Sequence, residues 1–365
     1  MGTCSPLLWA VPTGRLVRML AAVCLVNGCA ASPRPRVVYT PADLRATVAQ
    51  RAPELTPDLV IPFEVPPEAV ARARRLVARY TARSDQIRAL IDALGSSHGF
   101  ALTYASVVTT SAAETLATHQ GNCLALASVF IGLARALGLN AVYVDASARV
   151  SDLSQPTPGL VVNMGHITGM IQLDQRRWYL DFDQTLGGSP SLRVIDDLEA
   201  VAHFYNNRGF ERIELAVADQ KPVDWDEAAR DFARATSVSP GFARGWNNLG
   251  IARARAGRLD EAEQAYSRAV EVDPKAASAY NNLGALYLST GRIDLAIGAL
   301  RRAVELEPER AFIHLNLGRA SLLAHDLDAA KRELAEAARL RDSMARSLLT
   351  KLERYEELSR EEIVP

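Results

Sequence analysis

Cysteine is scarce in this sequence, because its 365 residues include only Cys4, Cys24, Cys29 and Cys123. Four cysteines in a chain of this length exclude a disulfide-rich scaffold. The formal net charge of −1 excludes a chain-wide basic field for nucleic acid, and 48% hydrophobic residues are too many for a disordered chain. At roughly 150 residues per domain, the length predicts two or three domains that each bury a core.

Several motifs of cofactor-dependent enzymes are also missing. The sequence contains no CxxC, no HExxH and no glycine-rich phosphate loop, so we expect no metal and no cofactor. A local basic cluster is present at Arg72, Arg74, Arg75, Arg79 and Arg83. We interpret it as the solvated face of a helix, with anionic lipid headgroups as the alternative partner.

The first 28 residues have the pattern of an export signal. Arg15 and Arg18 precede the apolar run MLAAVCLV at 19–26. Eight apolar residues are far fewer than the roughly 20 that span a bilayer, but they suit the hydrophobic part of a secretory signal peptide. The ending Val26-Asn27-Gly28-Cys29 resembles a bacterial lipobox, in which a small residue precedes a cysteine that becomes acylated.

The lipobox resemblance implies that residues 1–28 are removed and that Cys29 becomes a lipidated N-terminus. The alternative is an ordinary signal peptide cut near Ala30. Because Ala30 is not the aspartate that retains such lipoproteins at the inner membrane, the resemblance implies, for a Gram-negative host, an outer-membrane anchor facing the periplasm. Residues 29–58 are expected to form a tether, and Cys123 would be the only free thiol of the mature chain.

Small residues and proline recur every 34 residues in the C-terminal half. They are Pro240, Pro274 and Pro308, and Gly250, Gly284 and Gly318. Small residues let paired helices approach closely, and proline ends the second helix of each unit. The pattern resembles the tetratricopeptide repeat, which implies an all-α solenoid over 201–342. A segment with apolar residues at helical spacing, 343–365, is expected to cap its open end.

Solenoids of this kind have a concave groove that is formed by the first helix of each repeat. Groove positions would include Arg244, Asn247, Asn281 and Arg319. Asparagine and arginine can hold an extended peptide by its backbone amides or its carboxylate. A peptide or protein is therefore the expected partner. In the alternative interpretation the asparagines satisfy groups within the hairpins, and the array is a spacer.

Cys123 stands at the start of a strongly apolar segment in the region 59–200. From Leu124 to Leu137, apolar and small residues occupy nearly the whole circumference of a helix, so this helix should be buried and should end at Gly138. Asn122 is the expected N-cap. Free backbone N–H groups and the helix dipole at this end favour a thiolate. The pattern therefore predicts a nucleophile.

A thiolate nucleophile needs a base and a third group that orients the base. His166 begins a predicted strand, Ile167–Leu173, and a turn at Asp174–Gln175 returns the chain toward Asp181. Adjacent antiparallel strands can place Asp181 beside His166 and hold the imidazole in one tautomer. Asp183 shares the strand face of Asp181 and is the alternative acid.

This order of Cys, His and Asp resembles the transglutaminase-like superfamily, which has a papain-like arrangement. The matching segments are Gln120-Gly121-Asn122-Cys123, Gly165-His166 and Arg177-Trp178-Tyr179-Leu180-Asp181-Phe182. The resemblance implies that Cys123 is the nucleophile, His166 the base and Asp181 the orienting acid. Two positions depart from the usual pattern: Ile167-Thr168 replaces an aromatic pair, and Phe182 replaces a proline.

The expected fold is thus an α+β transglutaminase-like (papain-like) domain over 59–200 followed by an all-α repeat solenoid. The resemblance implies attack on amide bonds, by hydrolysis or acyl transfer, in an anchored lipoprotein that binds a peptide or protein partner. The alternative function is a non-catalytic assembly scaffold whose transglutaminase-like domain is inactive.

Overall fold

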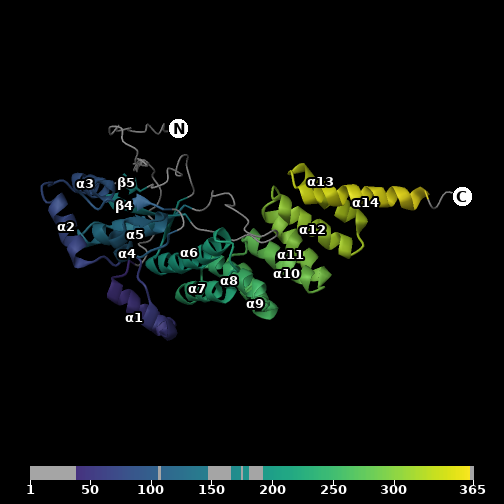
Figure 1. The fold of residues 1–365 in the computed structure, drawn as a ribbon, viewed down its shortest axis with the longest axis horizontal. Helices are drawn as coiled ribbons and strands as arrows, with labels where there is room; N and C mark the ends of the chain where they lie inside the picture. The colour runs from purple at the N-terminus through teal and green to yellow at the C-terminus, as the bar shows by residue number, and fades with distance from the viewer. Residues whose placement is uncertain (1–37, 106–107, 147–165, 174–175, 181–191, 362–365) are drawn as a thin grey trace. The chain divides into compact units, whose positions relative to one another are not determined.

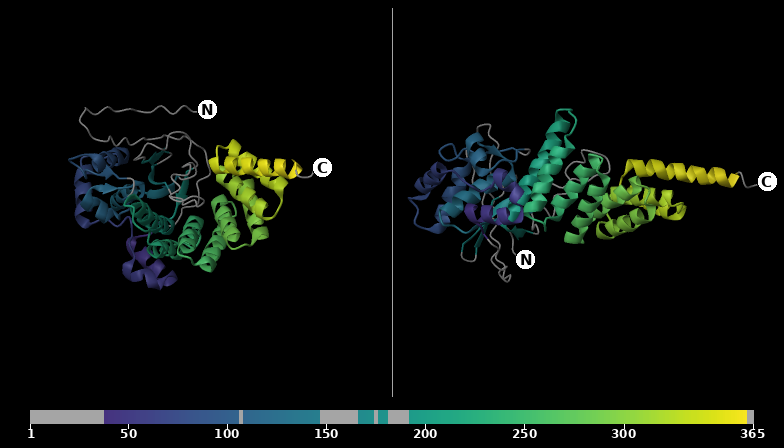
Figure 2. Two further views of the ribbon diagram at one scale, coloured as in Figure 1. Left: turned by 45° about the vertical axis from the view of Figure 1, so that its right-hand side comes forward. Right: turned by 90° about the horizontal axis from the view of Figure 1, so that it is seen from below.

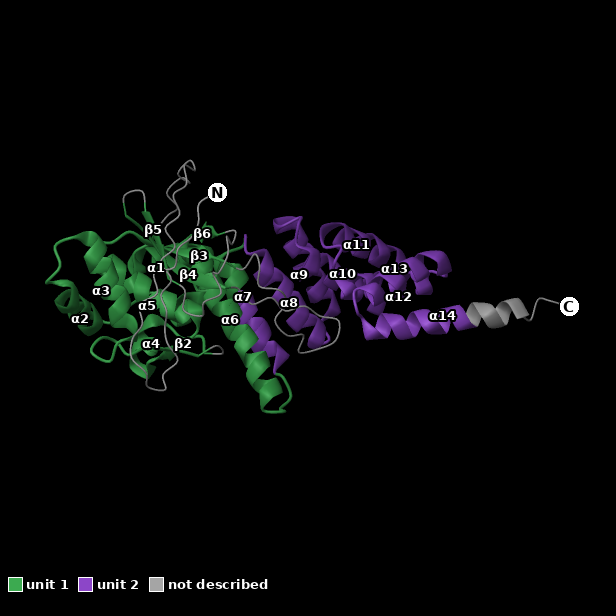
Figure 3. Ribbon diagram, turned by 90° about the horizontal axis from the view of Figure 1, so that it is seen from above, with its two compact units in different colours: residues 1–153, 164–223, 234–240 green, residues 154–163, 224–233, 241–365 purple. Residues whose placement is uncertain are grey.

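In the computed structural model (Figure 1), the described residues are 38–105, 108–146, 166–173, 176–180 and 192–361. They form two compact units, which Figure 3 shows in different colours. The first unit contains the described residues before 224 together with 234–240, and the second contains 224–233 and 241–361. Within these ranges, no helix combines the length and the apolar character that crossing a membrane requires.

The first unit begins with helical chain inside the segment 29–58 that was expected to be a tether. This part contains α1 (Pro41–Arg51) and the short 3-10 helix η1 (Pro53–Asp58). Leu44 and Val48, one helical turn apart, are completely buried, which fixes α1 on the unit. Any tether is therefore shorter than predicted, because the chain is folded from the start of α1.

Helix α5 (Cys123–Ala136) is the core of the first unit. It is contacted by α2 (Pro67–Val77), α3 (Arg83–Gly95), α4 (Ala112–Thr118) and the sheet. Its first three turns are buried, as the apolar pattern predicted. Gly138 follows the helix with φ +73°, a left-handed conformation that glycine adopts without strain. The predicted buried helix and its end are confirmed.

The sheet on α5 has the strand order β5-β4-β3-β6, and all neighbouring strands are antiparallel. Its strands are β3 (Ala141–Asp145), β4 (Ile167–Leu173), β5 (Arg176–Tyr179) and β6 (Arg193–Ile195). The predicted strand is confirmed as β4, with the same limits, and β5 is its predicted antiparallel neighbour. A short parallel pair, β1 (Thr103–Tyr104) and β2 (Gln120–Gly121), precedes α5 in the chain.

The long helix α6 (Asp197–Ala218) belongs to the first unit. Asp196 caps its N-terminus, and Arg135 of α5 donates to both oxygens of Asp197 at 2.8 and 2.9 Å. Because α6 runs without a break and is tied to α5 at its start, the domain boundary predicted at 200/201 falls inside a helix. The next helix, α7 (Trp225–Val238), contributes residues to both units.

The second unit contains successive helical hairpins (Figure 2), and their first helices begin 34 residues apart. The first helices are α8 (Ala243–Arg255), α10 (Ala277–Ser289) and α12 (Ala311–Leu323), and the second helices are α9 (Leu259–Val272), α11 (Ile293–Leu306) and α13 (Leu327–Arg339). Each hairpin packs on the next one. The predicted all-α repeat array is therefore confirmed.

Glycine at the crossing of each hairpin lets its two helices approach closely. A Cβ added at Gly250 would lie 2.5 Å from the ring of Tyr266, and one at Gly284 would lie 2.5 Å from Cγ of Leu300. Real Cβ atoms do not approach other atoms this closely, so the small residue is required for the packing. This explains why the glycines recur with the repeat period.

The last helix, α14 (Ser343–Glu361), lies in the segment 343–365 that was expected to cap the array. It packs on α13, where Ala345 and Leu352 join the apolar cluster that contains Leu334. The helix therefore covers apolar surface of the last hairpin.

Candidate functional site

Cys123 is the first residue of α5 and lies directly after its N-cap. The side-chain oxygen of Asn122 accepts the N–H of Ala125 at 3.0 Å, so the predicted cap is confirmed. A Cβ at Gly121 would lie 2.6 Å from that of Ala125, which explains the glycine before the cap. Cys123 is a free cysteine with 8% of its surface exposed.

Strand β3 runs back along α5 toward the end that carries Cys123. Near the other end of the helix, Arg135 donates from Nε to the carbonyl oxygen of Ala141 at 2.9 Å. Two residues further along β3, Tyr143 hydrogen-bonds to Ser128 at 2.8 Å. The strand therefore advances as the helix numbering decreases, and the end of β3 approaches the N-terminus of α5.

His166 lies at this same end of the sheet. The backbone N–H of Ala146, just beyond β3, donates to the carbonyl oxygen of His166 at 2.8 Å, and β4 begins at the next residue, Ile167. His166 is 8% exposed. The fold thus brings the predicted nucleophile and the predicted base, 43 positions apart in sequence, to one end of the layer formed by α5 and the sheet.

Asp181 and Asp183, the candidates for the orienting acid, lie outside the described residues, as does Cys29. The last described residue before them is Leu180, whose N–H donates to Gly169 of β4 at 2.9 Å. Thr168 donates its hydroxyl to the carbonyl oxygen of Leu180. The pairing between β4 and β5 therefore extends to Leu180, and the role of either acid stays a prediction.

Two further residues are connected to the N-cap of α5, Thr109 directly and Glu211 through Thr109, and sequence reasoning did not identify them. Asn122 donates from Nδ2 to the hydroxyl oxygen of Thr109 at 2.8 Å, and Glu211 of α6 accepts the N–H of Thr109 at 3.0 Å. Burial raises the pKa of Glu211 above its ordinary value, although the hydrogen bonds from Thr109 oppose this. No local pattern reveals this contact, because the two residues are 102 positions apart.

A separate cluster of ionisable groups lies where β3 and β6 meet α6. One ligand atom each from Asp145, Glu199 and His203 lie within 4.8 Å of one another, a spacing that a metal ion can use. Arg193, however, donates to both Asp145 and Glu199 at 2.9 Å. Burial lowers the pKa of Arg193, but hydrogen bonds to these carboxylates outweigh it and raise the pKa. The single positive charge of the arginine therefore offsets part of the negative charge of the two carboxylates.

Asparagines of the first helices form a continuous line of side-chain hydrogen bonds in the repeat array, which we name the amide chain. Asn316 donates to Asn281 (2.9 Å), Asn281 to Asn282 (3.3 Å), Asn282 to Asn247 (2.9 Å) and Asn247 to Asn248 (3.3 Å). All five residues are at most 4% exposed. The amide chain links three successive repeats through their interior.

Two of the four predicted groove residues therefore lie inside the array. Asn247 and Asn281 are buried in the amide chain, because the side of the first helix that carries them faces the next repeat. Arg244 on α8 is half-buried and Arg319 on α12 is exposed. Of the four predicted groove residues, the two arginines are therefore the ones whose side chains are accessible to a ligand.

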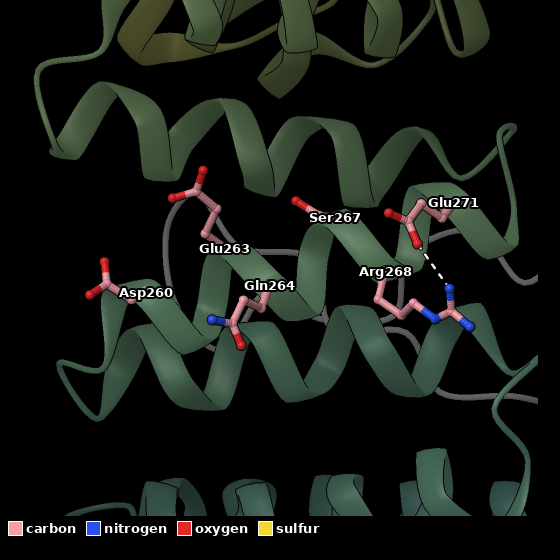
Figure 4. Close-up of a pocket in the computed structure, with 6 residues that line it drawn as sticks. All are labelled: Asp260, Glu263, Gln264, Ser267, Arg268 and Glu271. Atoms are coloured by element: carbon pink, nitrogen blue, oxygen red, sulfur yellow. Dashed lines mark hydrogen bonds and ion pairs between the residues drawn. The ribbon is translucent and has the colours of Figure 1, made fainter.

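A polar hollow lies over the outer surface of α9 (Figure 4). The residues that line it are Asp260, Glu263, Gln264, Ser267, Arg268 and Glu271. Arg268 is paired with Glu271 at 2.9 Å, and hydrogen bonds from Arg292 hold the pKa of Glu263 below its usual range. All six residues come from one helix and include no cysteine or histidine. The hollow therefore has no pair of groups comparable to Cys123 and His166.

Two solved structures are similar to a part of the chain. The first repeat domain of Spaghetti (RPAP3), solved with the HSP90 peptide SRMEEVD, is 21% identical with a TM-score of 0.30, and the match covers 31% of this chain and 94% of that one. MamA (41-end) from Desulfovibrio magneticus RS-1 is 19% identical with a TM-score of 0.38, and the match covers 43% of this chain and 85% of that one.

Family models match both parts of the molecule. The model of the transglutaminase-like superfamily matches residues 70–181, and two models of the tetratricopeptide repeat match 241–309 and 282–345. No curated protein is significantly similar to the chain in sequence. The chain therefore contains a transglutaminase-like domain over 70–181, followed by tetratricopeptide repeats over 241–345.

Proposed function

We propose that the transglutaminase-like domain is a cysteine hydrolase or acyltransferase that acts on amide bonds. The observation that carries the proposal is the placement of Cys123 and His166. A cysteine at the capped N-terminus of a buried helix and a histidine at the same end of the adjoining sheet are what thiolate catalysis requires. In general, the dipole and the free N–H groups of a helix N-terminus favour a thiolate over a thiol.

In the proposed reaction the Cys123 thiolate attacks the carbonyl carbon of an amide and forms a C–S bond. The tetrahedral intermediate collapses when the C–N bond breaks, and protonated His166 gives its proton to the leaving amine. Neutral His166 then takes a proton from water or from a second amine, which attacks the thioester and releases the thiolate. Asp181, or Asp183 in its place, orients the imidazole.

An activated acyl ester tests this reaction without knowledge of the natural substrate. We expect p-nitrophenyl acetate to give a burst of p-nitrophenolate and an acetyl group on Cys123 that mass spectrometry locates. Cys123→Ser should remove the burst, and His166→Ala should slow it. Acetylation no faster than that of a cysteine-containing peptide, with no effect of His166→Ala, would favour the non-catalytic scaffold instead.

The repeats are proposed to bind a peptide or protein. Arg244 and Arg319 lie on first helices of the array, where guanidinium groups can donate to the backbone carbonyl oxygens or to the terminal carboxylate of a peptide. We expect the double variant Arg244→Ala/Arg319→Ala to lose ligands that the full chain retains from a peptide library. Arg302→Ala, on the second helix α11, is the matched control, and equal loss in both variants would contradict the assignment.

The N-terminal segment is proposed to be a lipoprotein signal that ends in a lipidated Cys29, which anchors the protein in the outer membrane facing the periplasm. Support comes from the apolar run and the residues around Cys29. Metabolic labelling with palmitate should be lost in Cys29→Ser and kept in Cys24→Ser. Labelling that persists in Cys29→Ser would exclude the anchor.

A further inference from the structure

The carboxylate of Glu211 connects α6 to the loop that precedes the nucleophile helix. Its Oε2 accepts the backbone N–H of Thr109 at 3.0 Å, and the Thr109 side chain is also hydrogen-bonded to it. Thr109 is 8% exposed, so water cannot easily replace a lost acceptor. Removing this carboxylate would leave a buried N–H group without its partner, which is costly.

Thr109 connects Glu211 to the N-cap residue, Asn122. Its hydroxyl group can donate to Glu211 while its oxygen accepts from Nδ2 of Asn122, at 2.8 Å. The neighbouring carbonyl oxygen of Val108 accepts the N–H of Asn122 at 2.9 Å. Both the side chain and the backbone of Asn122, which is 3% exposed, are therefore held by residues 108 and 109.

The orientation of Asn122 in turn fixes the start of the helix. Its Oδ1 accepts from the N–H of Ala125, so Nδ2 must point toward Thr109 and the two ends of one amide are both used. A rotation of this amide would break both hydrogen bonds. The N-cap, and the residue that follows it, Cys123, are positioned by a line of contacts that begins on α6.

We propose that Glu211 is a positioning residue for Cys123 and acts through Thr109 and Asn122. The inference rests on the proposed function, because it assumes that Cys123 is the nucleophile. Glu211 does not touch the thiol in this line of contacts. Its role is to hold Asn122, and with it the first turn of α5 that begins at Cys123, in one orientation.

Two other roles for Glu211 predict different results. If its negative charge acted on the thiolate through space, neutralising it would move the alkylation of Cys123 to lower pH. If it only stabilised the fold, its removal would lower the melting temperature without a change in the pH profile. The positioning role predicts movement to higher pH, because the N-cap that favours the thiolate is lost.

The experiment uses the full chain with Cys4, Cys24 and Cys29 replaced by serine, so that Cys123 is the sole thiol. The rate of alkylation by iodoacetamide is measured against pH for Glu211→Ala and Glu211→Gln. Glutamine keeps an oxygen that can accept from Thr109, whereas alanine does not. Glu214→Ala, three residues further along α6, is the matched control.

We expect Glu211→Ala to be alkylated about tenfold more slowly than the parent on the rising part of the pH profile, because the profile moves to higher pH. Glu211→Gln and Glu214→Ala should stay close to the parent. The inference is wrong if Glu211→Ala keeps the parent profile while it remains folded, or if both Glu211 variants move to lower pH.

Hydrogen exchange separates failure of this inference from failure of the proposed function. In Glu211→Ala the amides of Thr109 and Ala125 should exchange faster, whatever Cys123 does chemically. If these amides exchange faster, the positioning contact is supported. If at the same time the alkylation of Cys123 does not depend on His166, the catalytic role of Cys123 is rejected. Unchanged exchange would reject the positioning contact itself.

Discussion

Asn282 donates a hydrogen bond from its side-chain amide to the side-chain oxygen of Asn247, 2.9 Å away, across the boundary between two adjacent repeats. Both residues are almost fully buried, and Asn282 also accepts from Asn281. The contact therefore lies in the middle of the amide chain. Because buried amide groups must be paired, the chain favours the one stacking of the repeats in which every link is made.

The first prediction concerns this link. Asn282→Ala removes the donor to Asn247 and the acceptor of Asn281, so the free energy of unfolding should fall by about 2–4 kcal/mol. Urea denaturation measures the change. Gln264→Ala, at an exposed position of α9, should stay close to the parent. Equal stability of the two variants would show that the amide chain contributes nothing.

The second prediction tests the glycine at a helix crossing. Gly284→Ala places a methyl group 2.5 Å from Leu300 and should destabilise the array by about 1–3 kcal/mol. Gly298→Ala is the matched control, because it lies in α11 with no atom within 4 Å of the added Cβ. It should stabilise the helix by about 0.5–1 kcal/mol. If the free energy of unfolding changes in the same direction in both variants, the steric requirement for glycine at position 284 is contradicted.

The third prediction is a pH dependence in the repeat array. His314 donates to Glu333 at 2.7 Å and to the carbonyl oxygen of Pro308 at 2.8 Å. The hydrogen bond to Glu333 raises the pKa of His314 above its ordinary value, burial opposes this, and the negative charge of nearby Glu336 adds to the rise. Folding therefore favours the protonated ring, so His314 contributes stability that is present at acidic pH and is lost at alkaline pH.

The test compares the parent with His314→Gln by urea denaturation between about pH 5.5 and 9. The extra stability of the parent should be complete below the unfolded pKa of about 6.5 and should decline as pH rises through the higher folded value. Glu333→Gln should weaken this dependence. A stability difference between the parent and His314→Gln that is constant, or that grows with pH, would contradict the raised pKa of His314.

The fourth prediction concerns the ion pair that joins α5 to α6. The Asp197 side chain is 2% exposed and that of Arg135 is 15% exposed, and Asp197 also accepts the N–H of Tyr39 at 2.8 Å. Asp197→Ala removes a buried carboxylate, leaves the partly buried guanidinium of Arg135 without this partner, and should cost about 3–5 kcal/mol of stability in the first unit.

The matched control for this ion pair is Arg302→Ala, which breaks the exposed pair with Glu305. Solvent screens such a pair, so no measurable change is expected. Calorimetry measures the melting temperatures of both variants and of the parent. A melting temperature of Asp197→Ala equal to that of the parent would show that the pair does not hold the two helices together.

Local sequence patterns were sufficient to predict the buried helix α5, its cap at Asn122 and the limits of β4. These features depend on residues that are neighbours along the chain, such as the apolar circumference of α5 and the glycine at 138. The repeat array was predictable for a similar reason. A 34-residue period identifies equivalent positions, and a glycine at each crossing is a steric requirement that recurs with them.

Contacts between distant segments were not predictable in the same way. Nothing near Glu211 indicates that it meets Thr109, because the contact exists only after α6 packs beside the loop. The repeat period likewise does not say which flank of a first helix faces its neighbour, and so Asn247 and Asn281 were expected in a groove. The boundary at 200/201 was misplaced because α6 has no proline or glycine break at that point.

The central claim is that Cys123 is a nucleophile served by His166, and the pH profile of its alkylation tests this most directly. In the chain whose other cysteines are serine, iodoacetamide should reach its half-maximal rate at lower pH than with the same chain unfolded in urea. His166→Ala should abolish that difference. A folded-state profile that matches the unfolded chain and is unchanged in His166→Ala would contradict the claim.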